Sequence, residues 1–330
     1  MIGKFWEAAG GKLADRWVMA AGPALVFWLG GLLAWVWAGV GGQRLDQVAR
    51  WLERWTAPAQ LVTLIVLLLV VVASALLVQR ATLGMLRLLE GYWPAWAARP
   101  RRALEQQVRE RAAEDRTAFT ELHRRREHLT EHLTELHRGR EHLDGEACGE
   151  IFAELSDVDR RIARIELRAH RRPPLIEAMP TPVGNILRAT EVRPDAKYGL
   201  NGVIVWPHLW LVLPDGVRQE VTAARKALDM TAATVVWGLA FCAFTPLAWW
   251  TLPTGLAVAA ASAVWWAPRR AEVFADLVDA AYDLYRFALY QQLRWPLPET
   301  PQQECAAGRD ITQYLWRGTP PPDGFRFTTS

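Results

Sequence analysis

Long apolar stretches alternate along this chain with segments that are dense in arginine and glutamate. No charged residue occurs from Trp17 to Val40, from Ala57 to Val78, or from Met230 to Ala267. As helices rising 1.5 Å per residue, the first two stretches can each cross a hydrocarbon core of about 30 Å. The third is too long for one crossing, and Pro246 and Pro253 allow it to divide. The pattern therefore predicts four membrane spans.

The third stretch is expected to cross outward over Met230–Trp250 and to return over Pro253–Ala267, with Thr251–Pro253 forming a tight turn. The return segment is only about 22 Å long as a helix. It must therefore continue helically past Arg269 or cross a thinned, protein-shielded region. The predicted fold class is all-α, a four-span helical membrane protein with a cytoplasmic coiled-coil hairpin.

Basic residues flank the predicted spans on one face, and the positive-inside rule makes that face cytoplasmic. Four spans place both termini on this side. Only four of the 38 basic residues are lysine, which fits a GC-rich bacterial genome, so we expect the inner (plasma) membrane. The flanking residues that decide the orientation are Arg80, Arg87, Arg99, Arg101, Arg102, Arg225, Lys226, Arg269 and Arg270.

The chain divides into four predicted parts. Residues 1–80 form an N-terminal membrane hairpin, and residues 81–229 form a cytoplasmic helical hairpin followed by a loop-rich segment. Residues 230–267 form a C-terminal membrane hairpin. Residues 268–330 form a cytoplasmic helix and a disordered tail, with a last short helix at Ile311–Trp316.

The cytoplasmic hairpin is predicted from apolar positions spaced alternately by three and four residues, the pattern of a helix–helix seam. Gly145 and Pro173 bound its second helix. Arginine interrupts the seam twice, and it would suit a partner carboxylate, a water-filled oligomer axis, or simple extension to solvent. The first helix carries Phe119, Leu122, Arg126, Leu129, Leu133, Leu136, Arg140 and Leu143. The second helix carries Ile151, Leu155, Val158, Ile162, Ile165 and Ala169.

A stripe of small residues runs along the first predicted span at strict four-residue spacing. It consists of Gly30, Ala34, Ala38 and Gly42. Small side chains let a second helix approach closely within a membrane. We therefore predict a helix-packing face here, against the alternative of a general richness in small residues.

One string resembles a catalytic motif. His128, Glu131 and His132 match the H-x-x-E-H arrangement of a class of zinc peptidases, in which two histidines on one helix face hold the metal. The string lies inside a quasi-repeat, however, and its residues fall outside the heptad seam. A third zinc ligand and a dry pocket are not apparent. We therefore expect no metal site, no catalytic residue and no enzyme activity.

Composition narrows the function classes further. The predicted spans carry no Asp, Glu, Lys, Arg or His, which argues against a proton-coupled transporter but permits a hydrophobic pore. A net charge of +3 gives no basis for nucleic-acid binding. Three cysteines without a Cys-x-x-Cys pair make neither a disulfide framework nor structural zinc. No cofactor is expected.

Several segments of the C-terminal half resemble uncharacterised multi-pass membrane proteins of actinobacteria, a resemblance that implies no activity. The layout of two spans, a long cytoplasmic helical stretch, two more spans and a cytoplasmic tail is similar to bestrophin anion channels. That second likeness is architectural only, because none of the bestrophin sequence motifs is present. The segments that carry the first resemblance are Thr181–Ala189, Tyr198–Leu200, Trp206–Trp210, Arg286–Tyr290 and Tyr314–Gly318.

Two functions fit these expectations. The first is a homo-oligomeric, channel-like or pore-like membrane protein whose cytoplasmic helices gate it or receive a signal. The alternative is a non-conducting anchor or scaffold that recruits a soluble cytoplasmic protein partner. In both cases the lipid bilayer is the constant partner.

Overall fold

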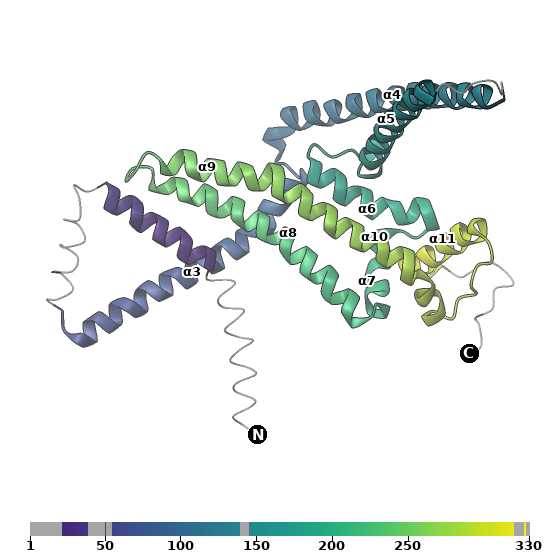
Figure 1. Ribbon diagram of the computed structural model, residues 1–330. Coiled ribbons are helices and arrows are strands. Elements are labelled where there is room, and N and C mark those ends of the chain that lie inside the picture. Colours follow the sequence, from purple (N-terminus) through teal and green to yellow (C-terminus); the bar gives the residue numbers. More distant parts are fainter. Residues whose placement is uncertain (1–21, 39–49, 51–54, 139–144, 320–326, 328–330) are drawn as a thin grey trace. The chain divides into compact units, whose positions relative to one another are not determined.

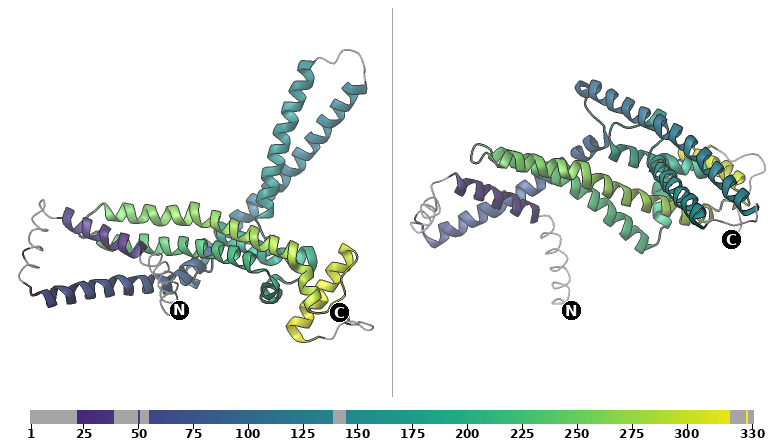
Figure 2. Two further views of the ribbon diagram at one scale, coloured as in Figure 1. Left: turned by 60° about the horizontal axis from the view of Figure 1, so that its bottom comes forward. Right: turned by 45° about the horizontal axis from the view of Figure 1, so that its top comes forward.

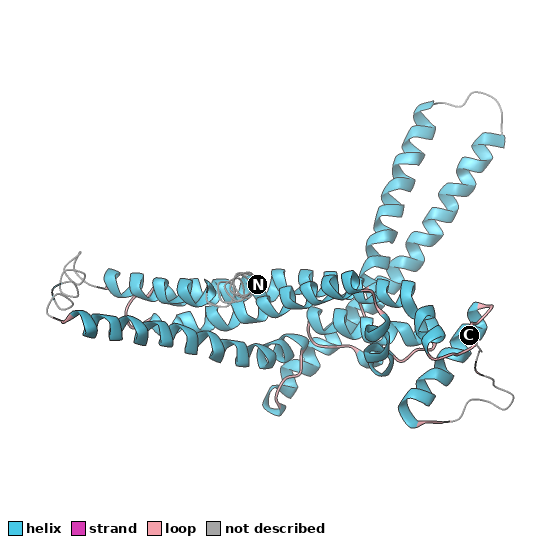
Figure 3. Cartoon of the chain, turned by 90° about the horizontal axis from the view of Figure 1, so that it is seen from below, coloured by secondary structure: helices cyan, strands magenta, loops and turns pink. Residues whose placement is uncertain are grey.

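The computed structural model describes residues 22–38, 50, 55–138, 145–319 and 327, and every regular element in this part of the chain is a helix (Figure 1, Figure 3). This confirms the predicted all-α class. The long helices are Gly22–Trp37, α3 (Ala57–Glu90), α4 (Ala98–Arg138), α5 (Gly145–His170), α6 (Pro182–Tyr198), α7 (Gly202–Val212), α8 (Asp215–Phe241), α9 (Thr251–Ala261), α10 (Ala267–Gln292) and α11 (Pro301–Arg317). The short helical turns are η1 (Ala95–Ala97), η2 (Leu175–Glu177), η3 (Cys242–Phe244) and the π-helical turn η4 (Ser262–Trp266).

The chain separates into two compact units. The first, called here the apolar unit, combines Met1–Leu89 with Ala223–Arg270. The second, called the polar unit, combines Glu90–Thr222 with Ala271–Ser330. Helices α8 and α10 each contribute residues to both units.

Two helical runs are long and apolar enough to cross a membrane, judged by length and composition. One is Ala57–Glu135, whose apolar part lies in α3, and the other is Asp215–Phe244, which comprises α8 and η3. Shorter apolar helices occupy Gly22–Trp37 and Gly202–Val212. Membrane-spanning length is thus present at two of the predicted spans, within the part of the chain that the structure describes.

Aromatic side chains join the N-terminal helix of the apolar unit to the α8–η3 segment. The ring of Phe27 lies 4.9 Å from that of Trp237 and 5.1 Å from that of Phe244, measured between centroids. Phe241 and Phe244 stack edge to face at 5.7 Å. Trp28 Nε1 donates a hydrogen bond to Ser74 Oγ at 3.1 Å, which links the same helix to α3.

The turn between α8 and α9 lies earlier than the sequence predicted. Helix α8 ends at Phe241 and η3 at Phe244, whereas Thr251 already begins α9. The prediction that the outward helix reaches Trp250 and that Thr251–Pro253 forms the turn was therefore wrong. Pro253 is compatible with the helix here because the N–H groups in the first turn of a helix have no acceptor within the helix, so the missing N–H of proline costs no hydrogen bond.

The helix that begins with α9 continues past Arg269, which is the first of the two alternatives predicted for this segment. Helix α9 leads through η4 directly into α10, so the chain is helical without a break from Thr251 to Gln292. The π-helical turn contains Ser262, which is fully buried and donates from Oγ to the Thr231 carbonyl oxygen of α8 at 2.8 Å. That bond fixes the register between the two helices where the local geometry departs from α.

In the polar unit, two helices occupy most of the segment that was predicted to be loop-rich. The Thr181 side chain caps α6 by accepting a hydrogen bond from the Gly184 N–H, and Pro182 stands at the first helical position, where proline is favoured. Asn201 caps α7 in the same way. Pro182 and Gly199 therefore mark helix ends, with Gly199 in the left-handed conformation between the two helices, whereas Pro194 lies within α6.

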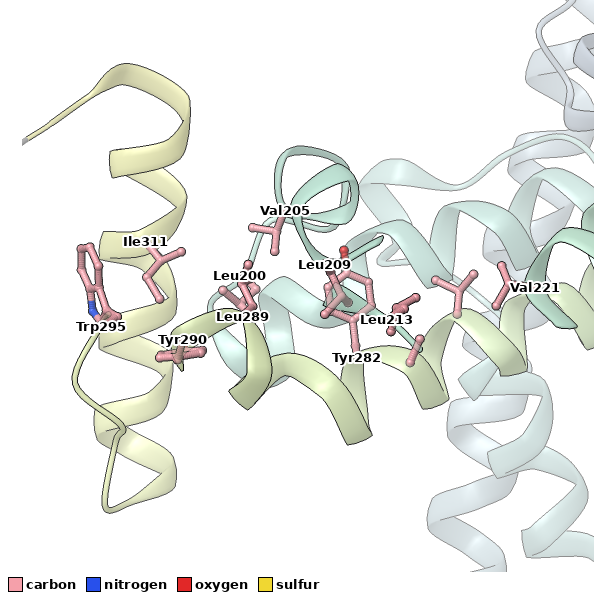
Figure 4. Close-up of a cluster of buried hydrophobic side chains, with 12 residues drawn as sticks. Leu200, Val205, Leu209, Leu213, Val221, Tyr282, Leu289, Tyr290, Trp295 and Ile311 are labelled. Carbon is pink, nitrogen blue, oxygen red and sulfur yellow. The ribbon is translucent and has the colours of Figure 1, made fainter. Parts of the chain in front are cut away.

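A hydrophobic core joins α7, the start of α8, α10 and α11 (Figure 4). Tyr282 is buried at its centre and donates from its hydroxyl to the Gly202 carbonyl oxygen at 2.8 Å, which ties α10 to the start of α7. The buried members are Leu200, Val205, Leu209, Leu213, Val221, Val278, Ala281, Tyr282, Leu289, Tyr290, Trp295 and Ile311. Apolar α7 is therefore a packed element of this core along one face.

Helices α4 and α5 lie side by side as a hairpin (Figure 2). They run antiparallel, because Arg125 pairs with Glu154 near one end and Asp115 pairs with Arg168 near the other. The buried seam consists of Leu129, Val158 and Ile162, with Phe119, Leu122, Ile151 and Leu155 packed against them. All of these occupy predicted seam positions, whereas Arg140 and Leu143 lie outside the described residues.

The last helix is longer than predicted. Helix α11 begins at Pro301, ten positions before the predicted start at Ile311, because Thr300 accepts a hydrogen bond from the Gln303 N–H and caps it. Gly318, at positive φ, ends it. Most of the predicted disordered tail lies outside the described residues.

Candidate functional site

The predicted packing stripe is only partly brought into contact. A Cβ added to Gly30 would lie 2.8 Å from Phe241 Cε2, and Ala34 is fully buried. Ala38 is exposed, and Gly42 lies outside the described residues. That all four residues form one packing face for a neighbouring subunit therefore stays a prediction.

Helix geometry explains why Ala38 lies off the buried face of its helix. Four residues advance an α-helix by about 400°, so each step along a strict four-residue spacing drifts about 40° around the axis. The buried positions instead follow spacings of seven and three: Ala24, Gly31 and Ala34. Gly31, which the sequence analysis did not select, has the closest contact, since an added Cβ would lie 2.4 Å from Phe244 Cζ. A seven-residue spacing was the signal that could have identified it.

A second close helix contact joins α8 to α9. A Cβ on Gly238 would lie 2.8 Å from the Gly255 carbonyl oxygen, and one on Gly255 would lie 2.5 Å from the Gly238 carbonyl oxygen. Such reciprocal contact requires glycine on both helices. The Cys242 thiol lies beside it and donates to the Gly238 carbonyl oxygen at 3.5 Å.

Ion pairs link the two helices of the hairpin at partly exposed positions. Arg126, one of the two predicted seam arginines, pairs with Asp159 of α5 at 2.8 Å. Arg125 pairs with Glu154. The alternative of a carboxylate partner is thus the one seen for Arg126, and the partner lies in the same chain. Because these side chains are about half exposed, each pair contributes little to stability but fixes the register.

One carboxylate closes the hairpin at its other end. Asp115 of α4 accepts hydrogen bonds from Arg168 of α5 at 2.7 Å and from Arg172 at 2.6 Å. The hydrogen bond from Arg168, reinforced by that from Arg172, lowers the pKa of the Asp115 carboxyl below its ordinary value. Asp115 therefore stays ionised at neutral pH and holds two arginines together.

The C-terminal end of α5 is fastened to α10 and α6. Arg171 pairs with Glu272 of α10 at 2.6 Å. Arg193 of α6 pairs with Asp279 of α10 and also donates to the carbonyl oxygen of His170. Burial, together with nearby Arg193, lowers the pKa of the His170 imidazole. The hairpin is therefore connected through charge pairs to a helix that is continuous with α9.

A second cluster joins the end of α6 to α10 and α11. The Tyr198 hydroxyl donates to Asp283 at 2.6 Å, and Lys197 lies 3.2 Å from the same carboxylate. Burial, with the hydrogen bond to Asp283, raises the pKa of Tyr198 to about 12. Arg286 pairs with Glu304 of α11 at 2.5 Å. Both are largely buried, so this pair positions α11 on α10.

The residues of the peptidase-like string lie on the outer face of α4. His128, Glu131 and His132 are all exposed, while Leu129 and Leu133 between them are buried against α5. Among the described residues there is no group of three or more His, Cys, Asp or Glu side chains placed to hold a metal ion. The expectation that the protein is not an enzyme stays a prediction.

Comparison with known protein families, with curated proteins and with solved structures finds no match to this chain. The resemblances to actinobacterial multi-pass proteins and to the bestrophin layout therefore stay predictions.

Proposed function

We propose that this chain is a four-span integral membrane protein of the bacterial inner membrane, with the polar unit and both termini in the cytoplasm. The main support comes from α3. Its apolar side chains are exposed all around the helix, from 48% to 64% each: Leu61, Val62, Leu64, Ile65, Val66, Leu67, Leu68 and Leu69. A helix in a soluble protein buries one face, and this stretch buries almost nothing.

The exposed apolar side chains of α3 become more stable when they enter a bilayer. Removing one such side chain from water stabilises a protein by about 1.5–3 kcal/mol, so eight of them represent on the order of 10 kcal/mol. A bilayer supplies that burial without any partner chain. The remaining spans in this proposal are the helix containing Gly22–Trp37, α8 with η3, and α9 with its helical continuation. Continuity through η4 removes the length problem of the short return segment.

We propose further that the protein works as a homo-oligomeric, channel-like or pore-like assembly gated by its cytoplasmic helices. The observation that carries this proposal is the continuity of α8 and α10, each of which belongs in part to both units. A displacement of the polar unit is transmitted along such helices without an intervening flexible loop. The apolar surface of α3, which the described part of the chain leaves exposed, offers a face for neighbouring subunits as well as for lipid.

A non-conducting anchor or scaffold is the second candidate function. It is favoured by the α4–α5 hairpin, which satisfies its own apolar seam and leaves a charged outer surface. Such a surface suits a soluble cytoplasmic partner of complementary charge.

One preparation tests both proposals. Membranes are first washed with alkaline carbonate, which should leave an integral protein in place, and the retained chain is then solubilised in detergent, purified and reconstituted into liposomes. Native mass and ion flux are measured on the same sample. An oligomer that conducts ions supports the channel-like function. An oligomer that passes neither cations nor anions supports the anchor. A monomer in detergent and in lipid overturns the pore, and release by carbonate overturns membrane insertion itself.

A further inference from the structure

The turn that connects α3 to α4 presents an aromatic side chain fully to its surroundings. Trp96, in the middle of η1, is 85% exposed, and Tyr92 is also exposed. The turn itself is firmly packed. Ala97 is buried, and Gly91 has a φ of 99° with its Cα against Pro180, where an added Cβ would lie 2.5 Å from the ring. Trp96 is thus held outward by a well-packed turn.

The same turn is strongly basic. Residues 91–104 contain three arginines and no acidic residue. Arg101 pairs with Glu105 at 2.7 Å, whereas Arg99 and Arg102 are exposed and form no ion pair within the part of the chain that the structure describes. An exposed indole next to unpaired guanidinium groups matches a phospholipid surface, because the ring prefers the interface and arginine binds phosphate.

The length of α3 brings this turn to the height of the lipid headgroups. Its 34 residues extend about 51 Å, which matches the 40–45 Å thickness of a bilayer with its headgroup regions when the helix is tilted by about 30°, within the usual range of tilts. If α3 begins at the outer surface, its last residue, Glu90, emerges at the inner surface. Tyr92 and Trp96 follow immediately. The helical turn η2, which precedes the Pro180 that contacts Gly91, adds Ile176, which is 88% exposed.

We propose that the Tyr92–Arg102 segment docks on the anionic phospholipid headgroups of the cytoplasmic leaflet, with Trp96 inserted between headgroups and with Arg99 and Arg102 bound to phosphates. This inference rests on the proposed membrane insertion. Docking fixes the connection between α3 and the hairpin to the membrane surface. It therefore makes the position of the hairpin dependent on lipid charge.

The test compares two labelled variants of the full chain. Trp96→Cys carries an environment-sensitive fluorophore, and the matched control is Trp316→Cys, which replaces a tryptophan that is also exposed (63%) and also adjacent to an arginine. In both, serine replaces the three native cysteines. Each protein is reconstituted into vesicles of phosphatidylcholine alone, or of equal parts phosphatidylcholine and phosphatidylglycerol, and acrylamide is used as a neutral quencher.

We expect the label at position 96 to be protected from acrylamide in the phosphatidylglycerol vesicles and not in phosphatidylcholine, with no difference at position 316. High salt should abolish the protection because it shortens the screening length. Adding Arg99→Gln and Arg102→Gln should shift the docked-to-undocked ratio by about thirtyfold towards undocked. Hydrogen exchange of the wild-type segment 91–97 in nanodiscs of the same lipids gives a second readout without any substitution.

Equal quenching at position 96 in both lipids, with no change in hydrogen exchange, would overturn the proposal while leaving membrane insertion intact. Protection only in native membrane vesicles would overturn it in favour of a protein partner. A protein that does not float with the vesicles fails the proposed function, and this inference falls with it.

Discussion

The contact between α6 and α11 leads to a sharp prediction about Gly308. In the structure, the backbone of α11 at Gly308 meets the end of α6, and an added Cβ would lie 1.9 Å from the Tyr198 carbonyl oxygen and 3.1 Å from the Gly199 carbonyl carbon. Both are backbone atoms, so no side-chain rotation can relieve the clash. We expect Gly308→Ala to separate α11 from α6.

The magnitude follows from two opposing effects. Alanine is favoured over glycine inside a helix by about 1 kcal/mol. Against this, the Cβ would be roughly 1.5 Å short of the 3.4 Å at which ordinary van der Waals contact begins. Separating the helices by that distance loosens the packing of Ile311, which is fully buried and worth about 1.5–3 kcal/mol, and it weakens the Arg286–Glu304 pair. We expect a net destabilisation of α11 of about 2 kcal/mol.

The assay is hydrogen exchange of the α11 amides in the purified full chain, which reports the free energy of local opening. The matched control is Gly149→Ala in α5, also a helical glycine of the polar unit, where an added Cβ meets nothing within 4 Å. That change should slow exchange locally by up to about tenfold, since only helix propensity is altered. If Gly308→Ala protects α11 or leaves its exchange unchanged, the close contact does not exist in solution.

Three further predictions concern the remaining clusters. Ala34→Leu should destabilise the apolar unit by about 1–3 kcal/mol in thermal unfolding, because Ala34 is fully buried. Ala38→Leu should leave the monomer intact, because Ala38 is exposed, and it should lower the native mass only if Ala38 lies between subunits. Asp115→Asn should lower the free energy of unfolding by about 1–2 kcal/mol at pH 7. The pKa of Asp115 is lowered on folding, so its contribution to stability is present above the pKa of the unfolded state and is lost as the pH falls through the pKa of the folded state. The stabilities of variant and wild type should therefore converge at low pH. Replacing His128 and His132 by Gln should leave folding and ion flux unchanged, and a loss of flux with assembly intact would revive a metal-dependent role for the pair.

Local rules explain what the sequence analysis predicted well. The heptad spacing predicts the hairpin seam because side chains three and four residues apart lie on one helix face, whatever the rest of the protein does. Leu129 and Val158 are buried for this reason. Helix capping also acts locally, yet the sequence prediction did not use two capping threonines. Thr181 before Pro182 and Thr300 before Pro301 are helix-start signals in the sequence itself. The first lies in the segment that was predicted to be loop-rich, and the helix after the second was predicted too short.

Tertiary structure alone decided which partner each face meets. Spacing shows that Ala34 shares a face with Gly30, but not that the face meets phenylalanine rings from a segment about two hundred residues later. The ion pairs between Arg193 and Asp279 and between Arg286 and Glu304 join helices that no local pattern connects. Charge patterns along a helix are compatible with many partners. Only the packing of α6, α10 and α11 on one core selects among them, because a buried charge is stable solely where the fold supplies its counter-charge.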